Sequence, residues 1–174
     1  MSSKSKSLSV LLFLCGLMVA LPASAQLPRT LIPGITFTTA AGLQKSFGNY
    51  QHEKLMIWQV ATWCGSCAAG LHVLDEHRAE LKKAGLRVIL LRMYQDGGYP
   101  GMSITQFVNR VAPSLWQQAN WVIGDASASF ARTYNPKKYP DIYYLINQKG
   151  VVVAINGAPS ATYGLIKKFM VGKK

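Results

Sequence analysis

The chain has 174 residues, of which 49% are hydrophobic, enough for one compact domain with a substantial core. Its formal net charge is +12, with 19 Lys and Arg residues against 7 Asp and Glu residues. No basic run is interleaved with aromatic residues and no nucleic-acid-binding motif is present. The charge therefore indicates a cationic surface rather than a nucleic-acid-binding protein.

The first 25 residues are typical of a secretory signal. Two lysines near the start precede an apolar stretch over residues 8–21, and small residues then offer a cleavage site after Ala25. The apolar stretch is shorter than the roughly 20 residues that a membrane-spanning helix requires, so we expect cleavage; a retained anchor is the alternative. The sequence therefore predicts an exported protein with a single domain over residues 26–174.

The apolar patterning of this domain predicts alternating strands and helices. The predicted strands are residues 35–38, 43–47, 55–60, 86–93, 121–124, 141–146 and 151–155. The predicted helices are residues 66–83, 104–119 (with an interruption at Pro113), 126–134 and 161–170. This order predicts an α/β fold with a central mixed β-sheet, helices on both of its faces, and an N-terminal β-hairpin.

Cleavage of the signal would remove Cys15 and leave a single cysteine pair, Cys64 and Cys67. Two cysteines are too few for the disulfide framework of a small secreted scaffold, so the domain must fold on its hydrophobic core. The pair follows the predicted strand 55–60 and opens the predicted helix 66–83. In open α/β sheets, functional sites form at this carboxyl end of the strands.

A helix N-terminus stabilises a thiolate through its unpaired N–H groups and its dipole, so we expect a lowered pKa for Cys64. The CxxC spacing places Cys67 one turn further along the helix. This geometry predicts Cys64 as the exposed attacking thiol and Cys67 as the buried thiol that resolves a mixed disulfide.

Two other interpretations of the pair are weaker. A zinc site needs four ligands, and His52, His72 and His77 form no paired motif that would complete one, so we expect no bound metal. A purely structural disulfide that closes so small a loop would stabilise the fold little. Dithiol–disulfide exchange is the leading hypothesis.

Three segments resemble the TlpA-like group of exported thiol–disulfide oxidoreductases in the thioredoxin superfamily. KLMIWQVATWCGSC (54–67) resembles the active-site strand and W-C-x-x-C motif, and ITFTTAAGLQKSF (35–47) resembles the added N-terminal hairpin. YPDIYYLINQKGVVVAINGAPS (139–160) resembles the proline, strand, turn and strand that follow in the family. The resemblance covers roughly residues 33–171 and implies the thioredoxin fold.

The resemblance also implies roles for individual residues. Cys64 would be the nucleophile and Cys67 the resolving cysteine, cycling between a dithiol and a redox-active disulfide. Pro140 would lie opposite the pair behind a cis peptide bond, since only X–Pro bonds adopt this isomer cheaply. The residues implied in substrate binding are Trp63, Gly65, Ser66, Tyr139 and Pro140, with the backbone of Tyr139 pairing with an extended substrate. A place in the core is the alternative for Trp63.

The sequence departs from the family pattern in its acids. Trp58 stands where cytosolic thioredoxins carry an acid, and Gly70 stands where many TlpA-like reductases carry a glutamate. Asp75 and Glu76 lie further along the predicted helix, where we expect them to be too far from Cys67 to accept its proton. The proton acceptor is therefore expected to be water or a side chain outside the motif.

These observations together predict a periplasmic thiol–disulfide oxidoreductase that acts more as a reductase and uses no cofactor. The expected partners are exported cysteine-containing proteins and a membrane thiol reductant or oxidant, and the expected state is a monomer. Two alternatives remain open: a thiol oxidase or isomerase, and a thioredoxin-fold accessory protein or metallochaperone whose CxxC is ancillary.

Overall fold

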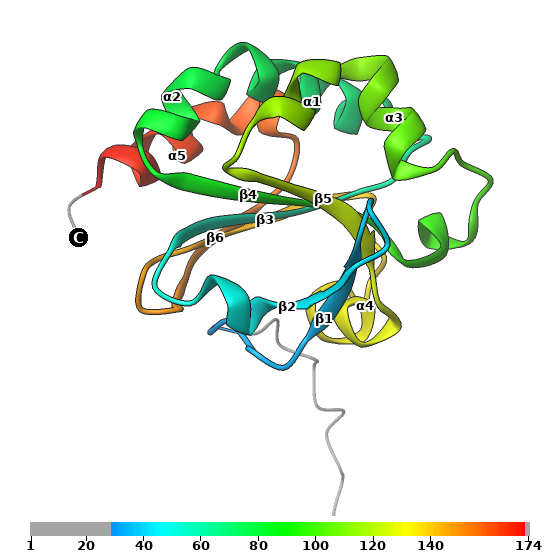
Figure 1. The fold of residues 1–174 in the computed structure, drawn as a ribbon, viewed down its shortest axis with the longest axis horizontal. Helices are drawn as coiled ribbons and strands as arrows, with labels where there is room; N and C mark the ends of the chain where they lie inside the picture. The colour runs from blue at the N-terminus through cyan, green and yellow to red at the C-terminus, as the bar shows by residue number, and fades with distance from the viewer. Residues whose placement is uncertain (1–28, 173–174) are drawn as a thin grey trace, which may run out of the picture.

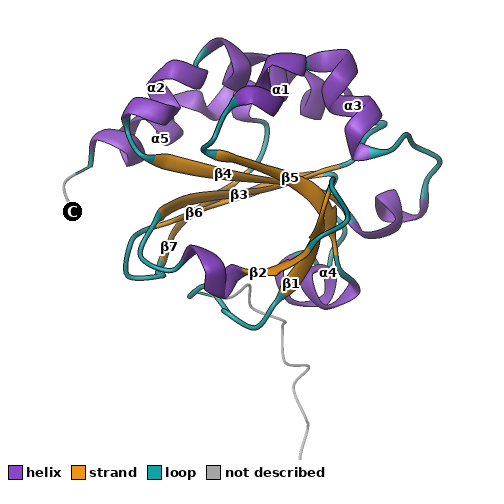
Figure 2. Cartoon of the chain, viewed as in Figure 1, coloured by secondary structure: helices purple, strands orange, loops and turns teal. Residues whose placement is uncertain are grey.

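The computed structural model describes residues 29–172, so the predicted signal and Cys15 lie outside the described residues. A seven-stranded mixed sheet forms the centre of the described chain, with helices on both faces (Figures 1 and 2). The predicted α/β architecture is therefore confirmed, including the N-terminal hairpin. Within residues 29–172, no helix combines the length and apolar character needed to cross a membrane.

The sheet has the strand order β2-β1-β5-β4-β3-β6-β7. Strands β3, β4 and β5 run parallel, whereas β6 pairs antiparallel with β3, β7 with β6, and β1 with both β5 and β2. The strands are β1 (Thr36–Thr39), β2 (Gln44–Ser46), β3 (Lys54–Val60), β4 (Leu86–Arg92), β5 (Trp121–Ala126), β6 (Asp141–Ile146) and β7 (Val152–Asn156).

The helices cover the two faces of the sheet unequally. Helices α1, α2, α3 and α5 lie on one face, and α4 and the β1–β2 hairpin lie on the other side (Figure 1). The helices are α1 (Gly65–Glu76), α2 (Arg78–Lys83), α3 (Ile104–Val111), α4 (Ala128–Tyr134) and α5 (Pro159–Val171), and the short 3-10 helices are η1 (Phe47–Tyr50), η2 (Tyr94–Gly98) and η3 (Pro113–Gln117).

Two predicted helices differ in their continuity. The helix expected over residues 66–83 is divided at His77, whose φ of −94° and ψ of 10° are not helical. The His77 ring stacks on Tyr163 of α5, with ring centroids 4.1 Å apart, at the point where α1 gives way to α2. The interruption expected at Pro113 is confirmed: α3 ends at Val111, and the proline begins η3 because it has no N–H to continue the helical bonding.

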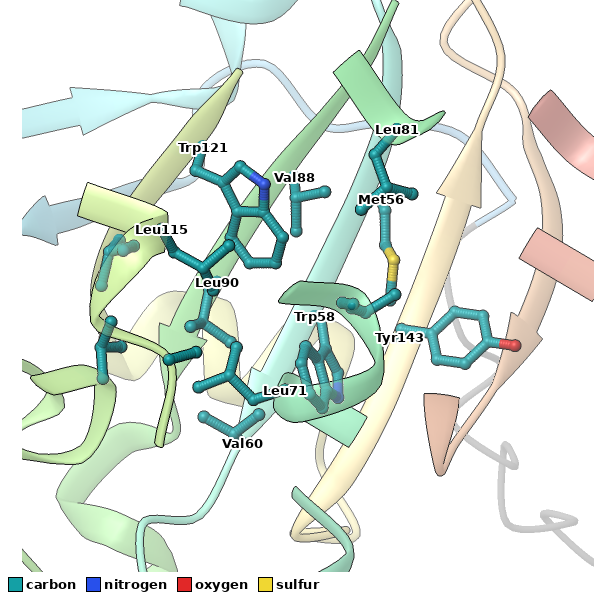
Figure 3. Close-up of a cluster of buried hydrophobic side chains, with 14 of the residues drawn as sticks. Met56, Trp58, Val60, Leu71, Leu81, Val88, Leu90, Leu115, Trp121 and Tyr143 are labelled. Atoms are coloured by element: carbon teal, nitrogen blue, oxygen red, sulfur yellow. The ribbon is translucent and has the colours of Figure 1, made fainter. Parts of the chain in front are cut away.

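The core has two layers because β3 alternates its side chains between the two faces of the sheet. Met56, Trp58 and Val60 join the cluster beneath the larger helical layer, as the close-up in Figure 3 shows. Leu55 and Ile57 join the cluster on the α4 side. Burial on both faces explains why the central strand is apolar along nearly its whole length.

Candidate active site

The two cysteines lie at the start of α1, immediately after β3. Cys64 is the N-cap of this helix and is half-buried, whereas Cys67 lies one turn inside and is fully buried. Both are free thiols. The structure thus places one sulfur where a substrate can reach it and the other behind it, as the CxxC spacing predicts.

The thiol of Cys67 is held in a largely dry environment. Its Sγ donates to the carbonyl oxygen of Pro140 over 3.0 Å. Burial is the largest cause that raises the pKa of Cys67, and the negative charge of Asp141 raises it further, followed by the neighbouring Cys64. This pKa lies well above the ordinary range of a thiol, so Cys67 stays protonated at neutral pH.

Asp141 is a site residue that the sequence analysis did not identify. This first residue of β6 accepts hydrogen bonds from Trp58 Nε1 and from Ser66 Oγ, both at 2.8 Å. One of its carboxylate oxygens and the two cysteine sulfurs lie within 4.8 Å of one another. Its place directly after Pro140, which the resemblance puts opposite the cysteines, was the signal that could have revealed it.

Trp58 and Gly70, which stand at the family's two acid positions, pack against each other. Trp58 is fully buried, and its indole lies against the position of Gly70 on α1. A Cβ added at Gly70 would come within 3.0 Å of two atoms of that indole and 2.9 Å of Pro159 Cδ. The large ring therefore occupies the space that any side chain at position 70 would need.

The acids further along α1 are engaged elsewhere. Asp75 accepts a hydrogen bond from Ser114 Oγ and forms an ion pair with Arg78, with 3.7 Å between Nη1 and Oδ1. Glu76 pairs with His72 on the exposed face of the helix. These contacts agree with the expectation that neither acid serves Cys67.

The residues between the cysteines face outward. Ser66 Oγ lies 3.1 Å from Cys64 Sγ while it donates to Asp141, so its hydroxyl joins the exposed sulfur to the carboxylate. A Cβ at Gly65 would meet nothing within 4 Å, which leaves open space beside Cys64.

Trp63 lies at the surface rather than in the core, with 44% of its area exposed. Its Nε1 donates to the carbonyl oxygen of Asp96 over 2.9 Å, and its ring packs edge-on against Tyr99 at 5.1 Å. The alternative of a core aromatic is therefore wrong, and the indole lies free to contact a molecule that approaches Cys64.

Pro140 lies opposite the cysteine pair, but its peptide bond is trans, since no cis bond occurs within residues 29–172. The expectation of a cis bond was therefore wrong. The trans form is the lower-energy isomer. In this form the Pro140 carbonyl still reaches both the Ala61 N–H, at 2.8 Å, and the thiol of Cys67. A left-handed residue, Lys138 (φ 55°), turns the chain into this position.

Tyr139 is 47% exposed, but its backbone is already bonded. Its N–H donates to Asn135 Oδ1 over 2.8 Å, and its carbonyl accepts from Asn135 Nδ2 over 2.7 Å. Beyond it, a surface hollow of about 370 Å³ is lined by residues 139–142 and 155–157. A substrate segment could lie in this hollow, and pairing with the Tyr139 N–H would require Asn135 to release it.

The site does not have the composition of a structural zinc centre. Such a centre uses four ligands, and the described His, Cys, Asp and Glu side chains gather here as three: Cys64, Cys67 and Asp141. Two of the histidines contact other groups, His72 facing Glu76 and His77 facing Glu80. The arrangement is a dithiol with an adjacent acid.

Known proteins place this geometry in context. The family model described as Redoxin matches residues 28–163, whereas no curated protein matches the chain. A secreted Mycobacterium tuberculosis disulfide oxidoreductase, described as homologous to E. coli DsbE, is 16% identical with a TM-score of 0.57; 78% of this chain and 92% of that chain are covered. A thiol:disulfide interchange protein from Bacteroides sp. is 14% identical with a TM-score of 0.58, over 85% and 93%.

Copper-bound yeast Sco1 is similar to the same degree in its fold. It is 10% identical with a TM-score of 0.59, and 84% of this chain and 96% of that chain are covered. Likenesses at such low identity show the fold alone. They confirm the predicted thioredoxin fold.

Proposed function

The chain belongs to the Redoxin family, and from the geometry of its dithiol we propose that it is a periplasmic thiol–disulfide oxidoreductase that reduces disulfides in exported proteins. The observation that carries the proposal is the unequal burial of the two free thiols at the start of α1. A partly exposed sulfur can attack a substrate, and a buried sulfur beside it can resolve the product.

The reaction transfers two electrons from the cysteine pair to the substrate. The Cys64 thiolate attacks one sulfur of the substrate disulfide, forms a mixed disulfide and releases the first substrate thiolate. Cys67 then loses its proton and attacks Cys64 Sγ, which forms the Cys64–Cys67 disulfide and releases the second substrate thiolate. Two protons end on the substrate thiols, so two enzyme thiols become a disulfide as one substrate disulfide becomes two thiols.

The surroundings of Cys67 keep this thiol protonated in the reduced pair. A strongly oxidising pair owes its potential to a stabilised reduced form, in which a thiolate is held by favourable charges and hydrogen bonds. Here burial and the Asp141 charge raise the pKa of Cys67, which disfavours a thiolate at this position. The buried thiol therefore contributes no stabilised thiolate to the reduced form, and the resemblance to the TlpA-like group is what supports a reductase over a thiol oxidase or isomerase.

The predicted signal over residues 1–25 supports export, and a secreted oxidoreductase is among the structural neighbours. A reductase in an oxidising compartment needs electrons from elsewhere, so we propose a membrane thiol reductant as the electron donor. We also propose that the chain acts as a monomer. Trp63 and the hollow at residues 139–142 are the proposed contacts for a cysteine-containing substrate.

Insulin reduction by the mature chain tests the proposal. The wild-type protein is expected to reduce insulin with a thiol donor, Cys64→Ser to be inactive, and Cys67→Ser to trap substrates as mixed disulfides. Activity that survives Cys64→Ser would overturn the proposed nucleophile. A reduction potential near or below about −250 mV supports the reductase, and one near about −120 mV would favour the oxidase.

The metallochaperone alternative is favoured by one observation, the similarity of fold to copper-bound Sco1. Two measurements on the reduced protein separate it from the reductase: copper(I) binding in competition with a chromogenic chelator, and insulin reduction. Tight binding of one copper(I) per chain together with absent insulin reduction would replace the proposed function.

A further inference from the structure

Resolution of a mixed disulfide requires a group that takes the proton of Cys67. This thiol is fully buried, and its pKa is raised well above neutral. A buried protonated thiol is a poor nucleophile, because the thiolate is the attacking form. Asp75 and Glu76 on α1 are bonded to Ser114, Arg78 and His72, and Trp58 and Gly70 stand at the family's two acid positions.

The geometry points to Asp141 as the proton acceptor for Cys67, held in place by Trp58 and Ser66. This inference rests on the proposed function and deepens it. A carboxylate oxygen of Asp141 lies within 4.8 Å of both sulfurs, a distance that one water molecule or a small rotation of the thiol can bridge. The carboxylate also has a fixed orientation, because each of its oxygens accepts a hydrogen bond.

The acid near the cysteines is supplied by β6 rather than by its neighbour β3. In the β3–β6 register Val60 lies opposite Asp141 and Trp58 opposite Tyr143, so all four side chains are on the α1 face of the sheet. Trp58 stands where an acid would be expected on β3, and its indole N–H instead binds an acid that β6 supplies. Trp58 is therefore a positioning residue that fixes Asp141 through its indole N–H.

Ser66 links the carboxylate to the other sulfur. Its hydroxyl has one proton, which it donates to Asp141, so its oxygen is available to accept from the Cys64 thiol. When Asp141 is protonated, it no longer requires the hydrogen bond from the Ser66 hydroxyl. That hydroxyl can then donate to Cys64 instead. Ser66 is therefore a second positioning residue.

The resolving step balances with Asp141 as a temporary carrier. The carboxylate takes the proton of Cys67, the Cys67 thiolate attacks Cys64 Sγ, and the bond from Cys64 to the substrate sulfur breaks. The protonated Asp141 then gives its proton to the departing substrate thiolate, or to water where that thiolate stays ionised, and returns to its ionised form. No external oxidant or reductant takes part in this step.

Few charged groups face this proton path. The ionisable groups that act on the Cys67 thiol are Asp141 on β6 and Cys64 at the start of α1. Asp141 also acts on Tyr143 of the same strand, whose hydroxyl is bonded to Thr162 of α5 at 2.8 Å. Tyr143 has a raised pKa and stays neutral at the pH of the assay, so it does not compete as a base.

The test is stopped-flow reduction of an aromatic disulfide that releases one coloured thiolate in each step. In the wild-type protein the second release is expected to be nearly independent of pH between about pH 6 and 8, because the base is held beside the thiol and is not drawn from solution. Asp141→Asn is expected to slow the second release about 100-fold at neutral pH. The remaining rate should rise in proportion to hydroxide, while the first release changes severalfold at most.

Two further variants separate proton transfer from general effects. Asp141→Glu keeps the carboxylate and is expected to restore part of the rate together with its flat pH profile. Asp125→Asn, which removes a carboxylate that faces Arg92 on β4, is the matched control and should leave both releases unchanged. An Asp141→Asn protein whose second release keeps the wild-type rate and pH profile overturns the inference and leaves the proposed function intact.

The failure of the two proposals can be told apart. A wild-type protein that shows neither release would contradict the proposed function itself. If Asp141→Asn lacks a cooperative unfolding transition, Ser66→Ala, at an exposed position, takes over the test. Loss of one of the two donors to the carboxylate is expected to slow the second release about three- to tenfold, and an unchanged rate would overturn the inference.

Discussion

Two adjacent residues of β3, Trp58 and Gln59, bury polar groups on opposite faces of the sheet and bind the same downstream segment. Trp58 Nε1 donates to Asp141 on the α1 side. Gln59 Oε1 accepts from Asn135 Nδ2 on the α4 side, and Asn135 in turn holds the backbone of Tyr139. The chain that faces the cysteines is therefore fixed from both sides of the sheet.

The two sides differ in how completely their polar groups are bonded. The Trp58 side ends at a carboxylate with a donor to each oxygen, next to the two thiols. On the other side Gln59 Nε2 is buried without a hydrogen-bond partner, beside a cavity of about 540 Å³ that Gln59, Arg132 and Lys138 help to line. The Trp58 side therefore orients a carboxylate beside the thiols, whereas the Gln59 side holds the chain at Tyr139 and leaves one of its own polar groups unbonded.

Gly70→Ala is expected to have the largest effect on stability, because it forces a methyl group against the indole of Trp58 and the ring of Pro159. Overpacking of this kind should lower the free energy of unfolding by about 2–3 kcal/mol, measured by denaturant titration. In a Trp58→Phe background the cost should be smaller, since the contacted part of the indole is gone. If Gly70→Ala lowers the free energy of unfolding equally in the wild-type and Trp58→Phe proteins, the expected contact between Gly70 and Trp58 is contradicted.

Trp58→Phe should lower the free energy of unfolding by about 1–2 kcal/mol, because it removes a charge-assisted hydrogen bond and leaves a gap in the core. It should also slow the second release in the stopped-flow assay, since Asp141 loses one of its two anchors. A matched substitution in the same cluster, Leu71→Met, is expected to leave that release unchanged. A slowing of both variants to the same extent would indicate a general loosening of the core.

The sequence was sufficient for the fold and for the two thiols because their signals are local. Strand 55–60, the cysteines directly after it and a helical pattern after them specify where Cys64 and Cys67 lie. Asp141 lies 75 positions after Ser66, so its contact with the site is long-range, and only its place directly after Pro140 could have connected it with the cysteines. The N–H of a buried tryptophan usually finds a hydrogen-bond partner, but the sequence of strand 55–60 does not show which group accepts from Trp58.

The stability of the reduced protein is expected to fall as the pH rises above about 8.5, where the unfolded chain ionises its cysteines. The pKa of Cys67 is higher in the folded state than in the unfolded state. Its contribution to stability is therefore complete at pH values below the unfolded pKa and is lost as the pH rises toward the folded pKa. The expected slope from this group is about 1.4 kcal/mol per pH unit. Denaturant titrations of the wild-type and Cys67→Ala proteins at a series of pH values measure this slope as the difference between them. Tyrosines with raised pKa values add to the slope above about pH 10 in both proteins.

Gln59→Met is expected to have the smallest effect, within about 1 kcal/mol of the wild type in either direction. The substitution preserves the volume of the side chain and removes the unpaired Nε2, which offsets the loss of the hydrogen bond from Asn135. Asn135 keeps its two bonds to Tyr139, so the chain opposite the cysteines should stay in position and both releases in the stopped-flow assay should keep their rates. A loss as large as that of Trp58→Phe would show that the two sides of β3 contribute equally, and that Gln59 positions the site as much as Trp58 does.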